Sequence, residues 1–372
     1  MKNFLSWIEI DRKALLSNAT LFKHLINPKI KFLAVVKGNA YSHGLVEIAK
    51  IIKDKVDLFG VNNLDEALIL KKLGIAKPIL ILGYTQNSRL TEVVKNKFHQ
   101  VVYNLETAKT FKRIIGKQQI QPFVHLKLEV GTNRQGTENS ELLEIAKILS
   151  PAIIGASIHF ANVEENGGFY QTQIKRFERQ LKLLRKAGIN PKILHTACTA
   201  AAILYPETHF SMVRVGIGLY GLWPSELTKK LAKGKKIYVE LKPVLSWKTK
   251  VAQVKSVRKG ETIGYGRTYK PKQNMKIAIL PVGYYDGYDR HLSNNSRVLI
   301  KGKFAPVVGR VMMNMIAADI TNIPNVKVED EVVLIGRQGI REITAEEMAE
   351  KIGTINYEAV TRINPLLPRI IV

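Results

Sequence analysis

The sequence predicts an α/β protein, in which an N-terminal (β/α)8 TIM-type barrel is followed by a mostly-β domain. Eight short apolar runs alternate with amphipathic segments of helical period over about 230 residues. A charged break at 231–238 ends this rhythm, and the rest of the chain has short β-like runs separated by turns with Gly or Pro. At 372 residues, the chain is also longer than one average domain.

The barrel elements are predicted in chain order. Residues 7–10 alternate like a short strand, and a helix is expected from there to about Ile26. Helical periodicity is clearest at 67–73, 141–149 and 177–187. A doubly wound open sheet is the alternative, but such a sheet usually has fewer strands in one domain. The expected barrel strands are 32–36, 57–61, 79–82, 99–102, 122–128, 152–158, 192–195 and 211–215.

The predicted domain boundary lies between residues 235 and 236. This gives a barrel domain at 1–235 and a β-rich domain at 236–372. In the second domain, a helical pattern is nearly absent until 345–352. Its expected strands lie within 244–257, 275–282, 297–300, 305–311 and 332–334.

Composition narrows the class of protein. The net charge is +26, and strong basicity can indicate binding to nucleic acid or to anionic membranes. The basic residues are scattered and form no long uninterrupted run, so a Lys-rich solvated surface is the favoured interpretation. Neither nucleic acid nor a membrane is therefore an expected partner, whereas an anionic small molecule is compatible with the charge.

Three further features favour a cytoplasmic protein. The single cysteine, Cys198, excludes an internal disulfide and a cysteine-based zinc site. The longest apolar runs are far shorter than a membrane span. The N-terminal stretch lacks the apolar core of a signal peptide, because Glu9 and Asp11 interrupt it early.

Lys37 is the first candidate catalytic residue. The apolar run 32–36 ends at this lysine, and Gly38 and Asn39 then turn the chain. In barrel folds, chemistry is usually held where a strand opens into a loop. Partial desolvation there lowers the pKa of a lysine and makes its amine a nucleophile for a carbonyl group. The alternative is an ordinary lysine at a strand end whose amine reaches solvent.

Other candidate binding residues follow later strands. Arg134 lies in a glycine-flanked loop and is either a clamp for a carboxylate or phosphate or an ordinary surface arginine. His159 is either a satisfied core residue or a side chain stacked on a flat aromatic cofactor. Thr199 is expected at a helix N-terminus, where free N–H groups bind phosphate. Gly216 and Gly218 would let the backbone approach a ligand closely, at the usual phosphate site of such barrels.

The stretch 216–221 also spells the G-x-G-x-x-G pattern of dinucleotide-binding proteins. That pattern needs a long helix next and an acidic residue about 20 positions further on. Here Trp223 and Pro224 interrupt the chain and a basic segment follows, so this interpretation is rejected. The histidines form no recognisable metal-binding spacing, and no metal site is expected.

Clustered tyrosines on glycine-rich loops mark the second domain. Tyr265 stands between two glycines in ETIGYGRTY, and the stretch PVGYYDGYDR at 281–290 carries three more tyrosines. Exposed tyrosines on such loops indicate a site. The alternative is that they only pack a domain interface.

Five blocks of the sequence resemble the alanine racemases, a family of enzymes that use pyridoxal 5′-phosphate (PLP) and have an N-terminal barrel and a C-terminal β domain. VVKGNAYSHG, at 35–44, is similar to the family's PLP-lysine signature. The stretches ETIGYGRTY, LPVGYYDGY, VGRVMMNM and NYEAVTRINPLLPR are similar to other family blocks and stand in the right order. The resemblance spans nearly the whole chain.

The resemblance implies PLP as the cofactor and a role for each matching residue. Lys37 would hold the cofactor covalently and act as one catalytic base, and Tyr265, reaching in from the partner subunit, would be the other. Arg134 would bind the PLP phenolic oxygen and the substrate carboxylate region, and the backbone of Met313 would help to hold that carboxylate. Lys127 corresponds to a position that is carbamylated in some members. The cofactor-binding residues would be Lys37, Tyr41, His159, Thr199, Arg214, Gly216, Ile217 and Tyr357.

Within this set, Arg214 would hydrogen-bond the pyridine nitrogen and His159 would lie against the ring. The implied activity is the interconversion of L-alanine and D-alanine by two-base proton transfer at Cα, which supplies D-alanine for peptidoglycan. The implied assembly is a homodimer with shared active sites, in which the β-rich domain contributes to the site of the partner subunit.

The sequence departs from the common family pattern at a few positions. Cys198 and Thr199 replace a common Asn-Ser pair, and Asn314 stands where an aspartate is usual. The loop after the fifth strand, LEVGTNRQG at 128–136, differs from the version that many members have. These departures leave Lys37 and Tyr265 intact.

A broad-specificity amino-acid racemase and a non-catalytic PLP-binding protein remain the alternatives. The known PLP-carrier proteins have a single barrel, so the C-terminal β domain argues against a carrier. Basic amino-acid decarboxylases of similar architecture usually present a catalytic cysteine from the second domain. This chain has no cysteine besides Cys198, which argues against a decarboxylase.

Overall fold

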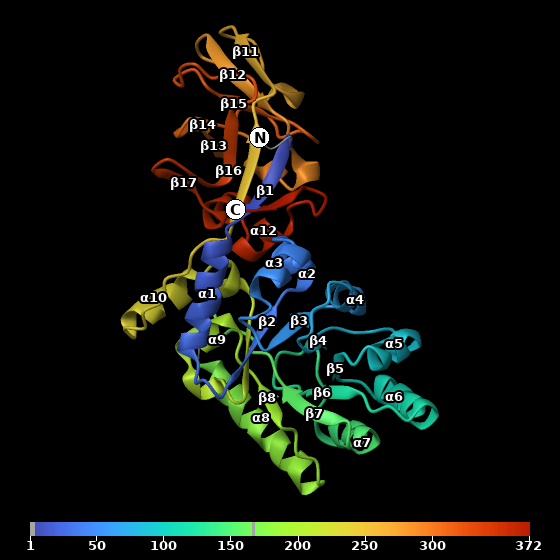
Figure 1. The fold of residues 1–372 in the computed structure, drawn as a ribbon. Helices are drawn as coiled ribbons and strands as arrows, with labels where there is room; N and C mark the ends of the chain where they lie inside the picture. Colours follow the sequence, from blue (N-terminus) through green and yellow to red (C-terminus); the bar gives the residue numbers. More distant parts are fainter. Residues whose placement is uncertain (1–3, 166–167) are drawn as a thin grey trace. The chain divides into compact units, whose positions relative to one another are not determined.

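A computed structural model describes residues 4–165 and 168–372 of the chain, which divides into two compact units (Figure 1). The barrel unit comprises Lys13–Ala40 and Ile48–Pro243. The β unit comprises Val244–Val372, Tyr41–Glu47 and the N-terminal segment up to Arg12. The first three residues of the stretch in which no signal peptide is expected lie outside the described residues. The boundary predicted between residues 235 and 236 remains a prediction.

Eight parallel strands form the sheet of the barrel unit, in the order β8-β7-β6-β5-β4-β3-β2-β9. Each strand coincides with one of the predicted apolar runs, so the eight predicted strands are confirmed. Backbone hydrogen bonds from Ser211 N to Leu194 O (3.1 Å) and from Arg214 N to Ala197 O (3.0 Å) join the two ends of the sheet. The strands are β2 Lys31–Val35, β3 Leu58–Val61, β4 Ile79–Ile81, β5 His99–Val102, β6 Phe123–Lys127, β7 Ile153–Ser157, β8 Ile193–His195 and β9 Met212–Val215.

The helices that follow the strands surround the barrel (Figure 1). Their buried faces are apolar, as in α7, where Leu142, Ile145 and Leu149 are fully buried. The helices expected from periodicity are confirmed in α4, α7 and α8, and the helix expected after residue 10 is α1. The larger helices are α1 Arg12–Leu25, α3 Leu45–Ile52, α4 Leu64–Lys72, α5 Leu90–Lys95, α6 Leu105–Gln118, α7 Asn139–Leu149, α8 Phe169–Lys186, α9 Thr199–Leu204 and α10 Glu226–Gly234.

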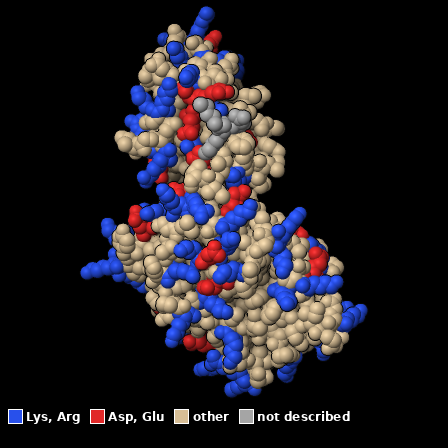
Figure 2. All heavy atoms as spheres, viewed as in Figure 1, with Lys and Arg blue, Asp and Glu red and all other residues tan. Residues whose placement is uncertain are grey.

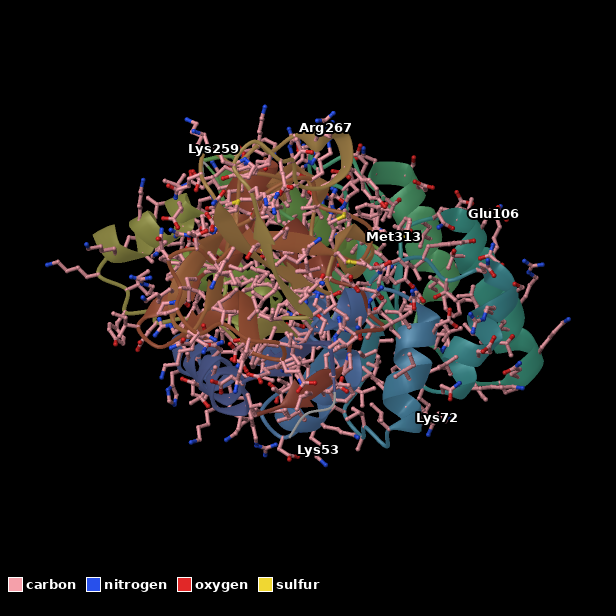
Figure 3. The ribbon with its side chains drawn as sticks, turned by 90° about the horizontal axis from the view of Figure 1, so that it is seen from above. Lys53, Lys72, Glu106, Lys259, Arg267 and Met313 are labelled. Atoms are coloured by element: carbon pink, nitrogen blue, oxygen red, sulfur yellow. The ribbon has the colours of Figure 1, made fainter. Side chains whose placement is uncertain are left out.

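Charged side chains are distributed widely over the surface. Figure 2 shows Lys and Arg side chains spread over the visible face, among fewer Asp and Glu. In Figure 3, Lys72 on α4 and Glu106 on α6 lie at the periphery of the barrel unit. Within the described residues, no helix is long and apolar enough to cross a membrane. The distribution fits the solvated surface expected from the sequence.

The interior of the barrel contains titratable side chains. His99, His125, Lys127, His195 and Arg214 are all buried, and they lie on β5, β6, β8 and β9. His125 and His195 are hydrogen-bonded although β6 and β8 are not neighbours in the sheet. Side chains from alternate strands meet inside a closed barrel. A polar core therefore fills the space between these strands.

Two sheets form the β unit. The larger has seven strands, in the order β14-β13-β16-β10-β1-β18 with β17 paired to β16, and the smaller has the order β11-β12-β15. The helix predicted at 345–352 is confirmed as α11 Ala345–Ile352, and α12 Asn356–Thr361 follows it. The strands are β1 Ser6–Ile10, β10 Leu245–Lys250, β11 Gln253–Val257, β12 Met275–Leu280, β13 Arg297–Ile300, β14 Lys303–Pro306, β15 Ile316–Asp319, β16 Glu331–Gln338, β17 Arg341–Ile343 and β18 Arg369–Ile371.

The strand expected at 305–311 is wrong beyond its first two residues. Strand β14 ends at Pro306, and Val307 makes only an isolated bridge with Ala318. Gly309 then adopts a φ of 79°, a conformation that interrupts an extended strand. The apolar residues of this stretch, such as Val308 and Val311, are buried in a loop.

The N-terminal strand β1 belongs to the sheet of the β unit. It pairs antiparallel with β10 and parallel with β18. Trp7, Ile8 and Ile10 are almost completely buried, so the strand has apolar neighbours on both faces. Lys248 on β10 forms ion pairs with Glu9 (3.0 Å) and with Glu331 on β16 (3.1 Å), which links three adjacent strands.

Asn18 on α1 fixes two later segments of the barrel unit. Its side-chain amide donates to Leu219 O (3.1 Å) and Lys242 O (2.8 Å), and its carbonyl oxygen accepts from Lys242 N (2.9 Å). The residue is fully buried. A buried backbone group that loses its partner keeps the cost of its desolvation, so this side chain stabilises the chain after β9.

We expect Asn18→Leu to lower the free energy of unfolding by about 2 kcal/mol, because one buried and two part-buried backbone groups lose their partner while the volume is retained. Urea unfolding followed by circular dichroism measures this. Thr20→Ala, at a half-buried position on the same helix, is the matched control and should change stability by less than about 1 kcal/mol. Equal losses for the two variants would contradict the role of Asn18.

Candidate active site

The candidate site begins where β2 ends. Lys37 follows the strand after Val36, and the chain then makes a left-handed turn in which Gly38 to Ser42 all have φ between 53° and 63°. Only the first of these five residues is glycine, and left-handed φ values are strained for the others. Local contacts must therefore hold the turn.

Glu66 on α4 provides such a contact within the barrel unit. Its carboxylate accepts hydrogen bonds from Asn39 N (3.2 Å) and Asn62 N (2.8 Å). One acidic side chain thus connects the turn after β2 with the loop after β3, and it supplies a negative charge near Lys37. In the β unit, Ser42 donates its hydroxyl to Ile363 O (2.9 Å) and its carbonyl accepts from Arg369 (2.9 Å).

The surroundings of Lys37 favour the neutral form of its amine. Burial lowers the pKa of Lys37, the charges of Arg134 and Arg214 lower it further, and Glu66 partly opposes them. The side chain still reaches solvent. A lysine whose protonated form is disfavoured can act as a nucleophile and as a base.

Arg214 on β9 is held by protein acceptors on both terminal nitrogens. One nitrogen donates to His195 Nδ1 (2.8 Å) and His195 O (2.6 Å), and the other donates to Ile158 O (2.8 Å) and Thr196 O (3.0 Å). Burial lowers the pKa of Arg214 to about 10. A guanidinium has five N–H donors, so Nε–H is the one that has no partner in the described part of the chain.

The segments after β8 and β9 form a close cradle of backbone. Thr199 begins α9, and its hydroxyl oxygen accepts from Gly216 N (3.2 Å) and Gly218 N (3.4 Å). A Cβ on Gly218 would lie 2.5 Å from Thr199 Cγ2 and 2.6 Å from Phe22 Cζ, so glycine is required there. Ile217 is buried beside these groups and begins a short 3-10 turn, Ile217–Tyr220.

The loop after β6 is shaped by Glu129. Its carboxylate accepts from the N–H groups of Val130 (2.8 Å), Gly131 (2.5 Å) and Thr132 (2.8 Å). Burial opposes the charged form, but these backbone bonds together lower the pKa of Glu129. The anion therefore organises the loop that presents the exposed side chain of Arg134.

Lys127 and His159 lie at the ends of β6 and β7. Lys127 is only 8% exposed, and burial holds its pKa well below 10.5, with repulsion from Arg214 and Arg134 adding to the effect. Burial also holds the pKa of His159 well below 6.5, so its imidazole is neutral at physiological pH. A neutral ring can lie against a flat apolar ring system.

The predicted residues of the β unit are placed on loops and on α12. The rings of Tyr41 and Tyr357 have centroids 6.3 Å apart. Tyr265 is 72% exposed and stands between Gly264 and Gly266, which have φ values of 72° and 70°. The exposed ring is thus carried on a glycine turn, as the sequence predicts.

Met313 lies on an exposed loop of the β unit (Figure 3). Its carbonyl accepts from Tyr285 N (3.0 Å), and its own N–H has no acceptor in the described residues. A Cβ on Gly283 would lie 2.1 Å from Met312 O, so the two loops touch through backbone. The N–H of Met313 is therefore available to an anionic ligand.

The barrel unit brings eight of the predicted residues to the carboxyl ends of its strands: Lys37, Lys127, Arg134, His159, Thr199, Arg214, Gly216 and Ile217. Tyr41, Tyr265, Met313 and Tyr357 lie in the β unit. No cluster of three or more potential metal-binding side chains occurs in the described ranges. A barrel with a desolvated lysine and excess positive charge at its strand ends defines a class of lysine-dependent enzymes that act on anionic substrates.

Comparisons with known proteins identify the family. The family model for the alanine racemase N-terminal domain matches residues 10–224, and that for the C-terminal domain matches 244–371. The alanine racemase of Methanococcus maripaludis is 40% identical over 371 residues, with 98% of each chain covered. That of Leptospira interrogans is 37% identical over 377 residues, which cover 99% of this chain and 96% of the relative.

Comparisons with solved structures lead to the same family. The alanine racemase from Bacillus anthracis with bound L-Ala-P has a TM-score of 0.93 and 36% identity, covering 100% of this chain and 96% of that one. The Clostridium difficile alanine racemase in complex with cycloserine has a TM-score of 0.90 and 34% identity, with the same coverage. This chain belongs to the alanine racemase family. The expected fold, the cofactor PLP and the function in alanine racemisation are thereby confirmed.

The residues present fit PLP. The free Nε–H of Arg214 suits an acceptor such as a pyridine nitrogen. At the cradle, the hydroxyl of Thr199 at the start of α9 binds the N–H groups of Gly216 and Gly218, and a Cβ on Gly218 would collide with Thr199 and Phe22. Closely packed glycine backbone beside a helix start suits a phosphate group. The roles of the individual residues remain proposals.

Sequence reasoning missed several residues that shape the site. Glu66 and Glu129 hold the turn after β2 and the loop after β6 through backbone N–H groups. His99, His125 and His195 are buried beside Arg214. Acceptors of backbone hydrogen bonds leave no motif, and the histidines are far apart in the sequence, so no local pattern could have identified them.

We expect Lys127→Met to be more stable than the parent at pH 7. At pH 7 the amine of Lys127 is neutral in the folded chain and protonated in the unfolded chain. Binding of this proton favours the unfolded state, so Lys127 lowers the free energy of unfolding. The free energy of unfolding contributed by Lys127 rises with pH from the lowered folded pKa to the ordinary value of 10.5. The stability difference should therefore shrink towards pH 10.5, as measured by urea unfolding in bicarbonate-free buffer.

Added bicarbonate extends this test to the proposed carbamylation. A carbamate on Lys127 would be an anion facing Arg214 and Arg134, so bicarbonate should stabilise the parent and leave Lys127→Met unchanged. Lys147→Met, at an exposed site on α7, is the control. No response of the parent to bicarbonate would contradict the carbamylation, and equal stability of Lys127→Met and the parent would contradict the pKa argument.

Proposed function

We propose that this chain interconverts L-alanine and D-alanine with PLP, and that Lys37 and Tyr265 are its two proton-transferring residues. The observation that carries the proposal is the amine of Lys37, which stands at the end of a barrel strand with its pKa lowered by burial. Membership of the family supports the reaction, and the position of this amine supports Lys37 as the first base.

The cofactor would be held mainly by residues of the barrel unit. Lys37 would bind it covalently, the cradle at Thr199, Gly216 and Ile217 would hold its phosphate, and His159 would lie against its ring. Arg214 would donate Nε–H to the pyridine nitrogen. Tyr41 and Tyr357 would complete the phosphate contacts, as the family resemblance implies.

Bound PLP supplies an electron sink for the pair of electrons that remains when Cα loses its proton. Lys37 accepts or returns this proton at Nζ on one face of the substrate, and the phenol oxygen of Tyr265 does so on the other. Arg134 and the N–H of Met313 hold the carboxylate. Inversion of configuration follows because the proton is removed on one face and delivered on the other.

The exposure of Tyr265 supports a homodimer with shared sites. Its ring is 72% exposed in the single chain, on a loop with two left-handed glycines. A catalytic phenol needs a drier environment than this, and a second copy of the chain would provide it. We therefore propose that Tyr265 completes the site of the partner subunit.

The product D-alanine suits the synthesis of peptidoglycan, which is the general role of the family. The cytoplasmic location predicted from the sequence stays a prediction. A broad-specificity racemase and a non-catalytic PLP-binding protein are the alternative functions, and rates with alanine, serine and lysine distinguish the first of these from an alanine enzyme.

We expect the purified protein to absorb between about 300 and 500 nm, as a PLP enzyme with a covalently bound cofactor does. Borohydride should abolish this absorption. L-Alanine in D2O should yield D-alanine with deuterium at Cα. Lys37→Ala should lose the absorption and the turnover, whereas Lys31→Ala, at the opposite end of β2, should retain both.

Absorption without turnover would support the non-catalytic alternative. Comparable rates with serine or lysine would support the broad-specificity alternative. A colourless protein that PLP cannot reconstitute would overturn the proposal and make Lys37 an ordinary residue at a strand end.

A mixed dimer tests the shared site. Lys37→Ala and Tyr265→Phe chains, each expected to be inactive alone, should recover activity when they are mixed, because one of the two sites then contains both native residues. Each mixed dimer has one intact site, so its activity should approach half of the activity of the parent dimer. No recovery in dimers verified by mass would show that both residues act within one chain.

A further inference from the structure

A continuous chain of hydrogen bonds runs through the barrel from Arg214. Arg214 contacts His195 Nδ1 (2.8 Å), His195 Nε2 contacts His125 Nδ1 (2.9 Å), and His125 Nε2 contacts His99 Nδ1 (3.1 Å). His125 and His195 are fully buried, and His99 is 8% exposed. Three imidazoles are thus connected in series behind the guanidinium.

The barrel is shaped to hold this chain. A Cβ on Gly155 of β7 would lie 2.2 Å from His125 Nδ1, so the central ring occupies space that only a glycine leaves open. The ring of His99 has its centroid 5.0 Å from that of Phe123, which lies beside the far end of the chain. The rings of His125 and His195 meet edge to face, with centroids 5.1 Å apart.

The direction of every hydrogen bond in the chain is determined by its first member. A guanidinium can only donate, so His195 Nδ1 must accept and its proton must lie on Nε2. That proton is donated to His125 Nδ1, which places the proton of His125 on Nε2 as well. His99 Nδ1 then accepts in turn, and the neutral ring of His99 also carries its proton on Nε2.

We propose that His99, His125 and His195 form a one-directional chain of neutral imidazoles, each protonated on Nε2, that positions Arg214 and keeps it charged. The inference rests on the proposed function, because it gives Arg214 a role toward the cofactor. The histidines are positioning residues, since they act through the arginine.

Electrostatics support the neutral state of all three rings. Burial lowers the pKa of His99 to about 4 and holds those of His125 and His195 well below 6.5. The charged groups that face the chain are Lys31, Lys127 and Arg214, and all are basic. No acidic group among the described residues is available to stabilise a charged imidazole there.

The chain strengthens the last acceptor. Hydrogen bonds in series polarise one another, so each donated proton makes the next Nδ1 a better acceptor. His195 Nδ1 thereby favours the protonated guanidinium, against the burial that lowers the pKa of Arg214. With both terminal nitrogens engaged, the plane of the guanidinium is fixed and Nε–H remains for the ligand.

The first measurement is the protonation state of the rings in the holoenzyme. Nitrogen-15 solid-state NMR of histidine-labelled protein distinguishes Nε2–H, Nδ1–H and doubly protonated imidazole. We expect His99, His125 and His195 to be neutral and protonated on Nε2 from pH 6 to 9, with assignments from single His→Gln variants. A proton on Nδ1 of His195 or His125, or a charged ring in this range, would overturn the inference.

The second measurement is the pKa of Arg214, followed by the carbon-13 shift of its guanidinium and assigned with Arg214→Lys. His125→Phe interrupts the chain but leaves the bond between Arg214 and His195, and we expect it to lower this pKa by about half a unit, because a bond in series changes the strength of its neighbour by roughly 10–30%. His125→Gln keeps an acceptor and a donor in series and should restore the parent value. His209→Gln alters a buried histidine that bonds Ala202 O outside the chain, and it should change nothing.

These outcomes separate the inference from the proposed function. An unchanged pKa of Arg214 in a folded His125→Phe protein would overturn the inference even if the parent racemises alanine. Failure of the parent to racemise alanine, with the predicted protonation of the rings intact, would overturn the function alone. Equal pKa changes in His125→Phe and His125→Gln would show that volume matters and the chain does not.

Discussion

The site depends on gathering basic groups, some of them buried, at the ends of the barrel strands and giving them few acidic partners. Lys37, Lys127 and Arg214 all have pKa values lowered mainly by burial, and each also repels others of the group. Glu66 and Glu129 are the nearby acids, and both are engaged with backbone N–H groups. An anionic ligand therefore relieves an unfavourable arrangement of charge. The barrel supplies the stability that maintains this arrangement when no ligand is bound.

Backbone geometry then gives the charges their positions. The left-handed turn after Lys37 is strained, and Glu66 holds it through the N–H of Asn39. The carboxylate of Glu129 does the same for the loop of Arg134. Both acids thus have an electrostatic and a mechanical effect, because each compensates a strained or irregular backbone beside a basic side chain.

Much of the fold was predictable because its signals are local. Each barrel strand is a short apolar run, and Lys37 stands out because a buried run ends at it before a Gly-Asn turn. The pairing of β1 with β10 was not predictable, because a short alternating strand does not specify a partner more than 200 residues away. The histidine chain escaped prediction for the same reason, since its members meet only after the barrel closes.

The placement of β1 has a consequence for how the protein forms during synthesis. This strand is synthesised before the barrel unit, yet its partners β10 and β18 follow after the whole barrel unit has been made. Until β10 and β18 are made, the apolar side chains of Trp7, Ile8 and Ile10 lack the neighbours that bury them in the folded protein. Unpaired strand edges of this kind favour wrong association. The barrel unit must therefore fold while β1 is still unpaired, and its strands must not pair with β1.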